Sequence, residues 1–121
     1  LSYTNFSYSD IKLSSSNLKG NQVLTASVTV SNTGSSKGKE VVQLYIRDLV
    51  GSIARPVKEL KGFQKIELAA GESKTVSFSI TTNELKFYNN DLKYDWESGD
   101  FDIMIGSSSA DVKKASVNWI K

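Results

Sequence analysis

Apolar and polar residues alternate along most of the chain, which is typical of half-buried β-strands. The clearest run is residues 23–30, where every second residue from Leu24 to Val30 is apolar and Thr or Ser lies between them. Residues 40–48 are largely apolar on both faces, so we expect an internal strand of a sheet there. Further strands are predicted at residues 75–81, 101–105 and 115–119, with weaker candidates at 8–13, 62–68 and 92–96.

Turn-forming residues separate these runs, as in Ser31-Asn32-Thr33-Gly34 and Ala70-Gly71-Glu72. The only helical signal is Thr82-Asn83-Glu84-Leu85, which reads as one capped turn. Short strands with turns every 8 to 12 residues favour two packed antiparallel sheets. We therefore predict an all-β, antiparallel β-sandwich of the immunoglobulin type, with about seven strands.

Composition removes several function classes. The chain has 121 residues, a net charge of +2, no Cys and no His, so it lacks the parts for a disulfide, a thiolate or imidazole metal site, or a His general base. The small positive excess is scattered and predicts no nucleic-acid partner, and no apolar run is long enough to predict a membrane partner.

Carboxylates are the remaining candidates for chemistry. A glycosidase needs two of them flanking one bond, and those of this chain fall in turns or on the polar faces of strands, where we expect solvated side chains. The cluster Asp95, Glu97, Asp100 and Asp102 is a candidate calcium site, but it lacks the spacing of the 12-residue calcium loop, so we expect a solvent-exposed face there instead. We predict no catalytic residue, no metal and no cofactor.

Aromatic residues offer a second kind of site, a flat platform for sugar rings. The candidates are Tyr45, Tyr88, Tyr94, Trp96 and Trp119. Aromatics at strand positions more often pack in a core or between domains. We therefore expect weak or no carbohydrate binding.

The segment from Arg55 to Phe63 carries the only Pro of the chain, which restricts the backbone and biases Arg55 towards an extended conformation. A stiff loop that bears a guanidinium favours docking to another domain. Phe63 is expected to be a core residue of its strand. The candidate domain-docking residues are Tyr3, Phe6, Arg55, Pro56, Lys58, Glu59 and Lys61.

Several segments in this order resemble one known family. They are Leu1-Ser2-Tyr3-Thr4, Val28 to Gly34, Gly38 to Tyr45, Arg55 to Phe63, Gly71-Glu72-Ser73 and Gly99 to Ser109. Together they closely resemble the C-terminal fibronectin type III-like domain of glycoside hydrolase family 3 enzymes, and Leu85 to Tyr88 and Leu92 to Asp95 add likeness to the bacterial periplasmic β-glucosidase type.

The resemblance implies an inter-domain tether at residues 1–7 and a fibronectin type III-like β-sandwich at residues 8–121. It implies a non-catalytic module that packs on and stabilises the catalytic domains of a parent β-glucosidase, which hydrolyses terminal β-D-glucosyl residues. It implies a periplasmic or extracellular location, with the cytoplasm still open. The alternative is an autonomous carbohydrate-binding or adhesion sandwich, and a contiguous apolar patch around Tyr3, Phe6, Pro56 and Phe63 would favour the docking module instead.

Overall fold

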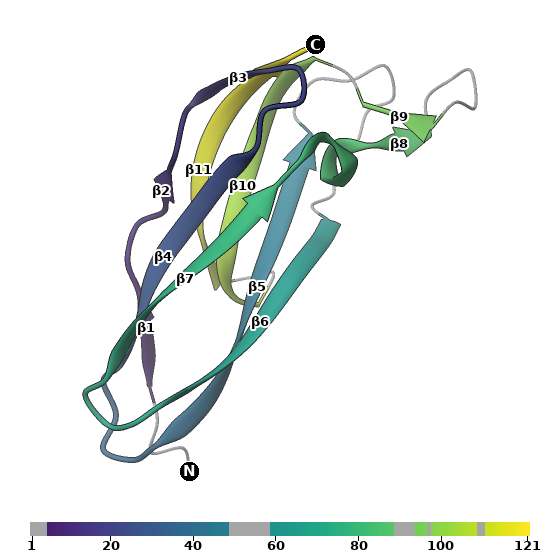
Figure 1. The fold of residues 1–121 in the computed structure, drawn as a ribbon. Coiled ribbons are helices and arrows are strands. Elements are labelled where there is room, and N and C mark those ends of the chain that lie inside the picture. Colours follow the sequence, from purple (N-terminus) through teal and green to yellow (C-terminus); the bar gives the residue numbers. More distant parts are fainter. Residues whose placement is uncertain (1–4, 49–58, 89–93, 97, 109–110) are drawn as a thin grey trace.

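A computed structural model describes residues 5–48, 59–88, 94–96, 98–108 and 111–121, and the side chains of residues 48, 59, 87, 88, 94 and 95 are outside that description. Two sheets face each other across one core (Figure 1). Sheet A contains β1 (Phe6–Tyr8), β2 (Lys12–Leu13), β4 (Leu24–Asn32) and β7 (Ser73–Ile80). Sheet B has the order β3 (Asn17–Lys19), β11 (Asp111–Ile120), β10 (Gly99–Ser108), β5 (Gly38–Asp48) and β6 (Glu59–Leu68).

Two small elements complete the described part of the chain. One is the 3₁₀ turn η1 (Thr82–Leu85), and the other is the pair β8 (Phe87–Tyr88) and β9 (Tyr94–Asp95). Among the described strands, all pairs are antiparallel except β3 with β11. The predicted β-sandwich is confirmed, and the described part of the chain forms nine strands in the two sheets instead of about seven. No helix among the described residues has the length and apolar character to cross a bilayer.

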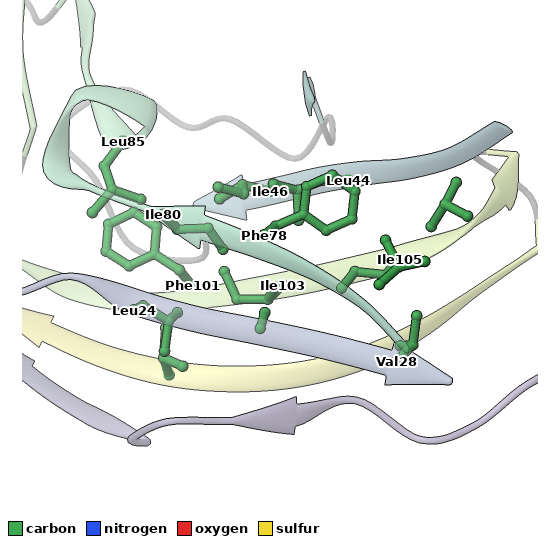
Figure 2. Close-up of a cluster of buried hydrophobic side chains, with 14 of the residues drawn as sticks. Leu24, Val28, Leu44, Ile46, Phe78, Ile80, Leu85, Phe101, Ile103 and Ile105 are labelled. Atoms are coloured by element: carbon green, nitrogen blue, oxygen red, sulfur yellow. The ribbon is translucent and has the colours of Figure 1, made fainter. Parts of the chain in front are cut away.

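The core forms where the alternating patterns of the two sheets meet. Every second residue of β4 from Leu24 to Val30 is buried, as the alternation predicts. Figure 2 shows Leu24 and Val28 from sheet A facing Ile103 and Ile105 from sheet B across the interior, with Phe78 of β7 among them. Strand β5 lies between β10 and β6, which confirms the internal position predicted for it.

The weaker strand expected at residues 8–13 is divided in the structure. Tyr8 belongs to β1 and Leu13 to β2, and both strands pair with β4. At the interruption, the hydroxyl of Ser9 accepts a hydrogen bond from Thr29 N at 2.8 Å, and directly after β2 the hydroxyl of Ser14 accepts one from Thr25 N at 3.0 Å. These side chains satisfy backbone donors of β4 that a continuous strand would pair, so the edge can break without leaving them unpaired.

The predicted capped turn is present at η1. Thr81 accepts a hydrogen bond from Asn83 N at 3.3 Å, and the carboxylate of Glu84 accepts one from Thr81 N at 2.9 Å, which completes a capping box. The turn places Leu85 in the core (Figure 2).

Candidate domain-docking surface

The predicted docking residues do not gather into one described surface. Tyr3, Arg55, Pro56 and Lys58 lie outside the described residues. Phe6 is in β1 and packs, partly buried, against the core. The backbone of Glu59 pairs with Ile46 at the start of β6, and Lys61 is the extra residue of a β-bulge two positions further on.

Phe63 was expected in the core, and that prediction is wrong because 58% of its side chain is exposed. Counting back from the buried Leu68 and Ile66, regular alternation places Gly62 on the inner side, opposite Leu44, and Phe63 on the outer side, opposite Gln43. The bulge at Lys61 shifts the alternation before it, so that Leu60 also lies on the outer side, opposite Tyr45. A Cβ added at Gly62 would lie 3.8 Å from the ring of Phe78. Phe78, rather than Phe63, is therefore the aromatic residue that fills the interior at this level.

Phe6 and Phe63 are not members of one patch. Phe6 belongs to β1 of sheet A, beside a hollow of about 250 Å³ that it shares with the start of β11, whereas Phe63 lies on β6 at the other end of sheet B. Phe6 and Phe63, the two described members of the apolar surface expected around Tyr3, Phe6, Pro56 and Phe63, therefore do not lie together. Phe63 instead has its exposed apolar neighbours on β5 and β6, namely Val41 and Leu60.

Tyr8 lines the hollow beside Phe6, and its hydroxyl is buried without a hydrogen-bond partner there. Burial raises the pKa of the Tyr8 hydroxyl, and the negative charge of Glu40 raises it further. Tyr8 therefore keeps its proton at neutral pH and is not available as an anionic nucleophile.

A partly buried ion pair lies on the outer face of sheet B. Arg47 of β5 and Asp102 of β10 are directly opposite in the register, and the Arg47 Nη2 atom lies 2.7 Å from the Asp102 Oδ2 atom. Ser116 of β11 donates a second hydrogen bond to Asp102 at 2.9 Å. Burial would raise the pKa of Asp102, but the hydrogen bonds from Arg47 and Ser116 outweigh it and leave the pKa below its usual value.

The expectation that the carboxylates are solvated is therefore wrong for Asp102. The sequence alternation does place Asp102 on the outer face, between the inward-facing Phe101 and Ile103. What it does not contain is the pairing register that brings Arg47 and Ser116 to either side of the carboxylate. The one signal for this ion pair in the sequence is Arg47, a basic residue in the strand predicted at residues 40–48.

The other carboxylates of the proposed calcium cluster do not converge among the described residues. Asp100 is exposed and accepts a hydrogen bond from Asn118 at 2.9 Å, while Glu97 and the side chain of Asp95 lie outside the description. Among the residues that are described, no three acidic side chains are grouped so as to hold a metal ion.

The two tryptophans are packing residues, as the sequence favoured. Trp96 and Trp119 are both buried and meet edge to face, with their ring centroids 6.2 Å apart. The Trp119 Nε1 atom donates a hydrogen bond to the carbonyl of Gly20 at 3.0 Å. Neither ring offers an open face for stacking on a sugar. Tyr45 is half-buried, and the side chains of Tyr88 and Tyr94 are outside the description.

Comparisons with known proteins place this sandwich in larger polypeptides. Residues 40–109 match the family model described as fibronectin type III-like domain. The chain is 52% identical over 116 residues to a periplasmic β-glucosidase of Salmonella typhimurium and 47% identical over 119 residues to a β-xylosidase of Formosa agariphila. These alignments cover 96% and 97% of this chain but 15% and 16% of the relatives.

A solved β-glucosidase structure from Erythrobacter marinus contains the same fold. It superposes with a TM-score of 0.92 at 38% identity, covering 99% of this chain and 16% of the other. The resemblance to the C-terminal fibronectin type III-like domain of glycoside hydrolase family 3 β-glucosidases and β-xylosidases is confirmed. The chain spans about one sixth of the length of the curated relatives it matches.

Proposed function

Because the chain belongs to the fibronectin type III-like domain family, we propose that it acts as a non-catalytic module that packs on and stabilises the catalytic domains of a glycoside hydrolase family 3 enzyme. The observation that carries the proposal is the coverage. The relatives match 96% or more of this chain and devote only 15% or 16% of their length to it. Such a polypeptide has ample other sequence for the reaction and presents this sandwich as a neighbour.

The described carboxylates support a non-catalytic role. Retaining hydrolysis of a glycoside needs one carboxylic acid with a raised pKa and one carboxylate nucleophile about 5 to 5.5 Å from it. Among the described residues, Asp102 is the only buried carboxylate, and its pKa is lowered by Arg47 and Ser116. An ionised and hydrogen-bonded carboxylate of this kind cannot protonate a leaving group.

The substrate and location of the parent enzyme follow from the relatives as proposals. One relative is a periplasmic β-glucosidase, which supports hydrolysis of terminal β-D-glucosyl residues in the periplasm or outside the cell. Because another relative is a β-xylosidase, xylosides are proposed as a second substrate class for the parent enzyme. Residues 1–7 are proposed as the tether to the preceding domain, although Phe6 and Ser7 already pair with β4.

The segment around Arg55 is proposed as part of the docking contact. It joins β5 to β6, and the sequence stiffens it with the only Pro of the chain. A restricted loop loses less conformational freedom when it is immobilised at an interface. Its members Arg55, Pro56, Lys58, Glu59 and Lys61, together with Tyr3 and Phe6, remain the candidate contact residues.

The test compares the full-length enzyme with a version that ends before this module, and it measures the melting temperature and hydrolysis of aryl β-glucosides and β-xylosides. We expect truncation to lower the melting temperature and the activity. If the truncated enzyme does not fold, Arg55→Ala in the full-length enzyme replaces it, with Lys12→Ala on β2 as the matched control. A truncated enzyme with unchanged stability and kcat/KM, or an Arg55→Ala effect equal to that of the control, contradicts the proposal.

A further inference from the structure

Three exposed apolar side chains lie together on the outer face of sheet B. Val41 of β5 is 37% exposed, and Leu60 and Phe63 of β6 are 53% and 58% exposed. The register places Leu60 opposite Tyr45 and Phe63 opposite Gln43, and Val41 is the diagonal neighbour of Phe63 on the same face. We call Val41, Leu60 and Phe63 the apolar patch. Contiguous exposed apolar residues of this kind mark interaction surfaces.

The polar groups beside the apolar patch are already hydrogen-bonded within the domain. The Tyr45 hydroxyl donates to the side-chain oxygen of Gln43, and the Gln43 Nε2 atom donates to the carbonyl of Ser107 at 2.9 Å. Covering these groups leaves few donors or acceptors without a hydrogen bond. Such unpaired groups are the usual free-energy cost of burying a polar surface. The face can therefore be removed from water with little loss.

The charge next to the apolar patch is positive. Lys39 and Lys65 are exposed and line an open hollow of about 410 Å³ together with Glu40, Val41, Ile66 and Glu67, so that with Lys37 the charged side chains at the hollow are three Lys and two Glu. Glu67 is already neutralised by Lys37, whose ammonium lies 2.9 Å from its carboxylate. Neither Lys39 nor Lys65 forms an ion pair within the described part of the chain. A complementary partner carries carboxylates at this border.

We propose that the apolar patch is the docking site for an apolar surface bordered by carboxylates on the catalytic part of the same polypeptide. This inference rests on the proposed function. Most of the length of each relative lies outside the region that matches this chain, so a covering surface is available in the same molecule. A second copy is a poorer occupant, because a twofold contact through this face would bring Lys39 and Lys65 close to their own counterparts.

The test measures how well the rest of the enzyme protects the apolar patch. The chain has no Cys, so Phe63→Cys and Val23→Cys can each be introduced into the full-length enzyme and labelled with a maleimide, with the labelled peptide identified by mass spectrometry. Val23 is the matched control, because it is 53% exposed and lies outside the patch. We expect Phe63→Cys to react roughly tenfold more slowly than Val23→Cys.

A second arm tests the charge. Lys65→Glu in the full-length enzyme should lower the melting temperature by roughly 1–2 °C relative to Lys12→Glu, an exposed position on β2. Equal labelling of the two cysteines, or protection of Phe63→Cys that disappears when dilution dissociates a dimer, overturns the inference. If Lys65→Glu and Lys12→Glu change the melting temperature equally, the inference that carboxylates border the docked surface is wrong. The proposed function fails separately, if removal of the whole module changes neither stability nor activity.

Discussion

Asp102 keeps its charge on the outer face of sheet B because two side chains hold it there. Arg47 and Ser116, from the two flanking strands, both donate hydrogen bonds to its carboxylate. Only 3% of the Asp102 side chain is exposed, whereas 35% of the Arg47 side chain is. The pair therefore contributes less than a fully buried one, but removing the carboxylate leaves a guanidinium with reduced compensation.

Asp102→Asn should destabilise the chain by roughly 1–3 kcal/mol, below the range for fully buried pairs because Arg47 is still partly solvated. The measurement is urea-induced unfolding, and Asp100→Asn on the same strand is the matched control. Since Asp100 is exposed, its change should stay within about 0.5 kcal/mol. Equal effects of the two variants would mean that the ion pair does not matter to stability.

The same residue predicts a pH dependence. Its folded pKa is lowered, so its contribution is present above the unfolded pKa of about 4 and is lost as the pH falls from there through the folded pKa. Asp102→Asn should therefore lose less stability than the unmodified chain over the interval in which the pH falls below about 4. Parallel curves for the two proteins over that interval would contradict this assignment.

Position 106 has no room for a side chain, so glycine is required there. A Cβ there would collide with the carbonyl oxygen of Asp111 and lie 2.7 Å from the Cα atom of Val112, at the point where the β10–β11 register shifts. Gly106→Ala should cost more than about 3 kcal/mol, because backbone atoms cannot yield as a flexible side chain does. Gly62→Ala is the control, since its Cβ meets atoms at 3.8 Å or more and should change stability by less than about 1 kcal/mol. Thermal unfolding of both variants decides.

At the scale of elements, single polar residues and one short turn fix the positions of longer strands and of core residues. The bulge at Lys61 places Leu60 on the same outer face of β6 as Phe63, and the Gln64 Nε2 atom on the same strand donates to the carbonyl of Ser77 on β7 at 2.5 Å. The β6 edge of sheet B is thus linked to the β7 edge of sheet A. The turn η1 plays a similar part, because its cap holds Leu85 in the core.

Thr81→Ala should cost about 1 kcal/mol, since it removes the hydroxyl that caps the first turn of η1 and contacts Glu84. The measurement is chemical unfolding of the chain. Asn83→Ala is the control: its exposed side chain is not the cap, and we expect a change within about 0.5 kcal/mol. A Thr81→Ala protein as stable as this control would show that η1 does not depend on its cap.

At the scale of the whole molecule, the one buried carboxylate among the described residues, Asp102, has a lowered pKa, whereas the acid of a glycosidase needs a raised one. The isolated chain should therefore not hydrolyse aryl β-glucosides or β-xylosides. Turnover that follows the chain through purification and disappears when one carboxylate is replaced would contradict this prediction.

The buried tryptophans predict weak or no binding of soluble sugars. Tryptophan fluorescence titrated with cellobiose, xylan and laminarin should show no saturable change, because neither indole has a face open for stacking. Micromolar dissociation constants that are lost in Trp96→Ala or Trp119→Ala would favour the carbohydrate-binding alternative.

Much of the fold could be predicted from local pattern, and less of the surface could. Alternation located β4, β5 and β7, and the segment Thr82-Asn83-Glu84-Leu85 located η1, although its cap is Thr81. The docking residues were chosen from a Pro-containing segment that lies mostly outside the described residues, so that prediction stays open. The apolar patch was missed because it depends on cross-strand neighbours of a strand whose bulge has no clear sequence signal.

The sandwich and the absence of Cys and His chemistry could be predicted from the sequence alone, because period-2 burial, turn residues and composition are local properties. The family followed from the resemblance of several segments in order, such as Arg55 to Phe63, and the family model confirms it. Which charged residue is buried and which side chains share an exposed face depend on the pairing of strands instead. Asp102 meets Arg47 through the register of two strands far apart in the chain, and Leu60 joins Phe63 on the outer face because Lys61 is inserted between Leu60 and Gly62. Alternation within one strand does not contain the register between strands or the position of a bulge.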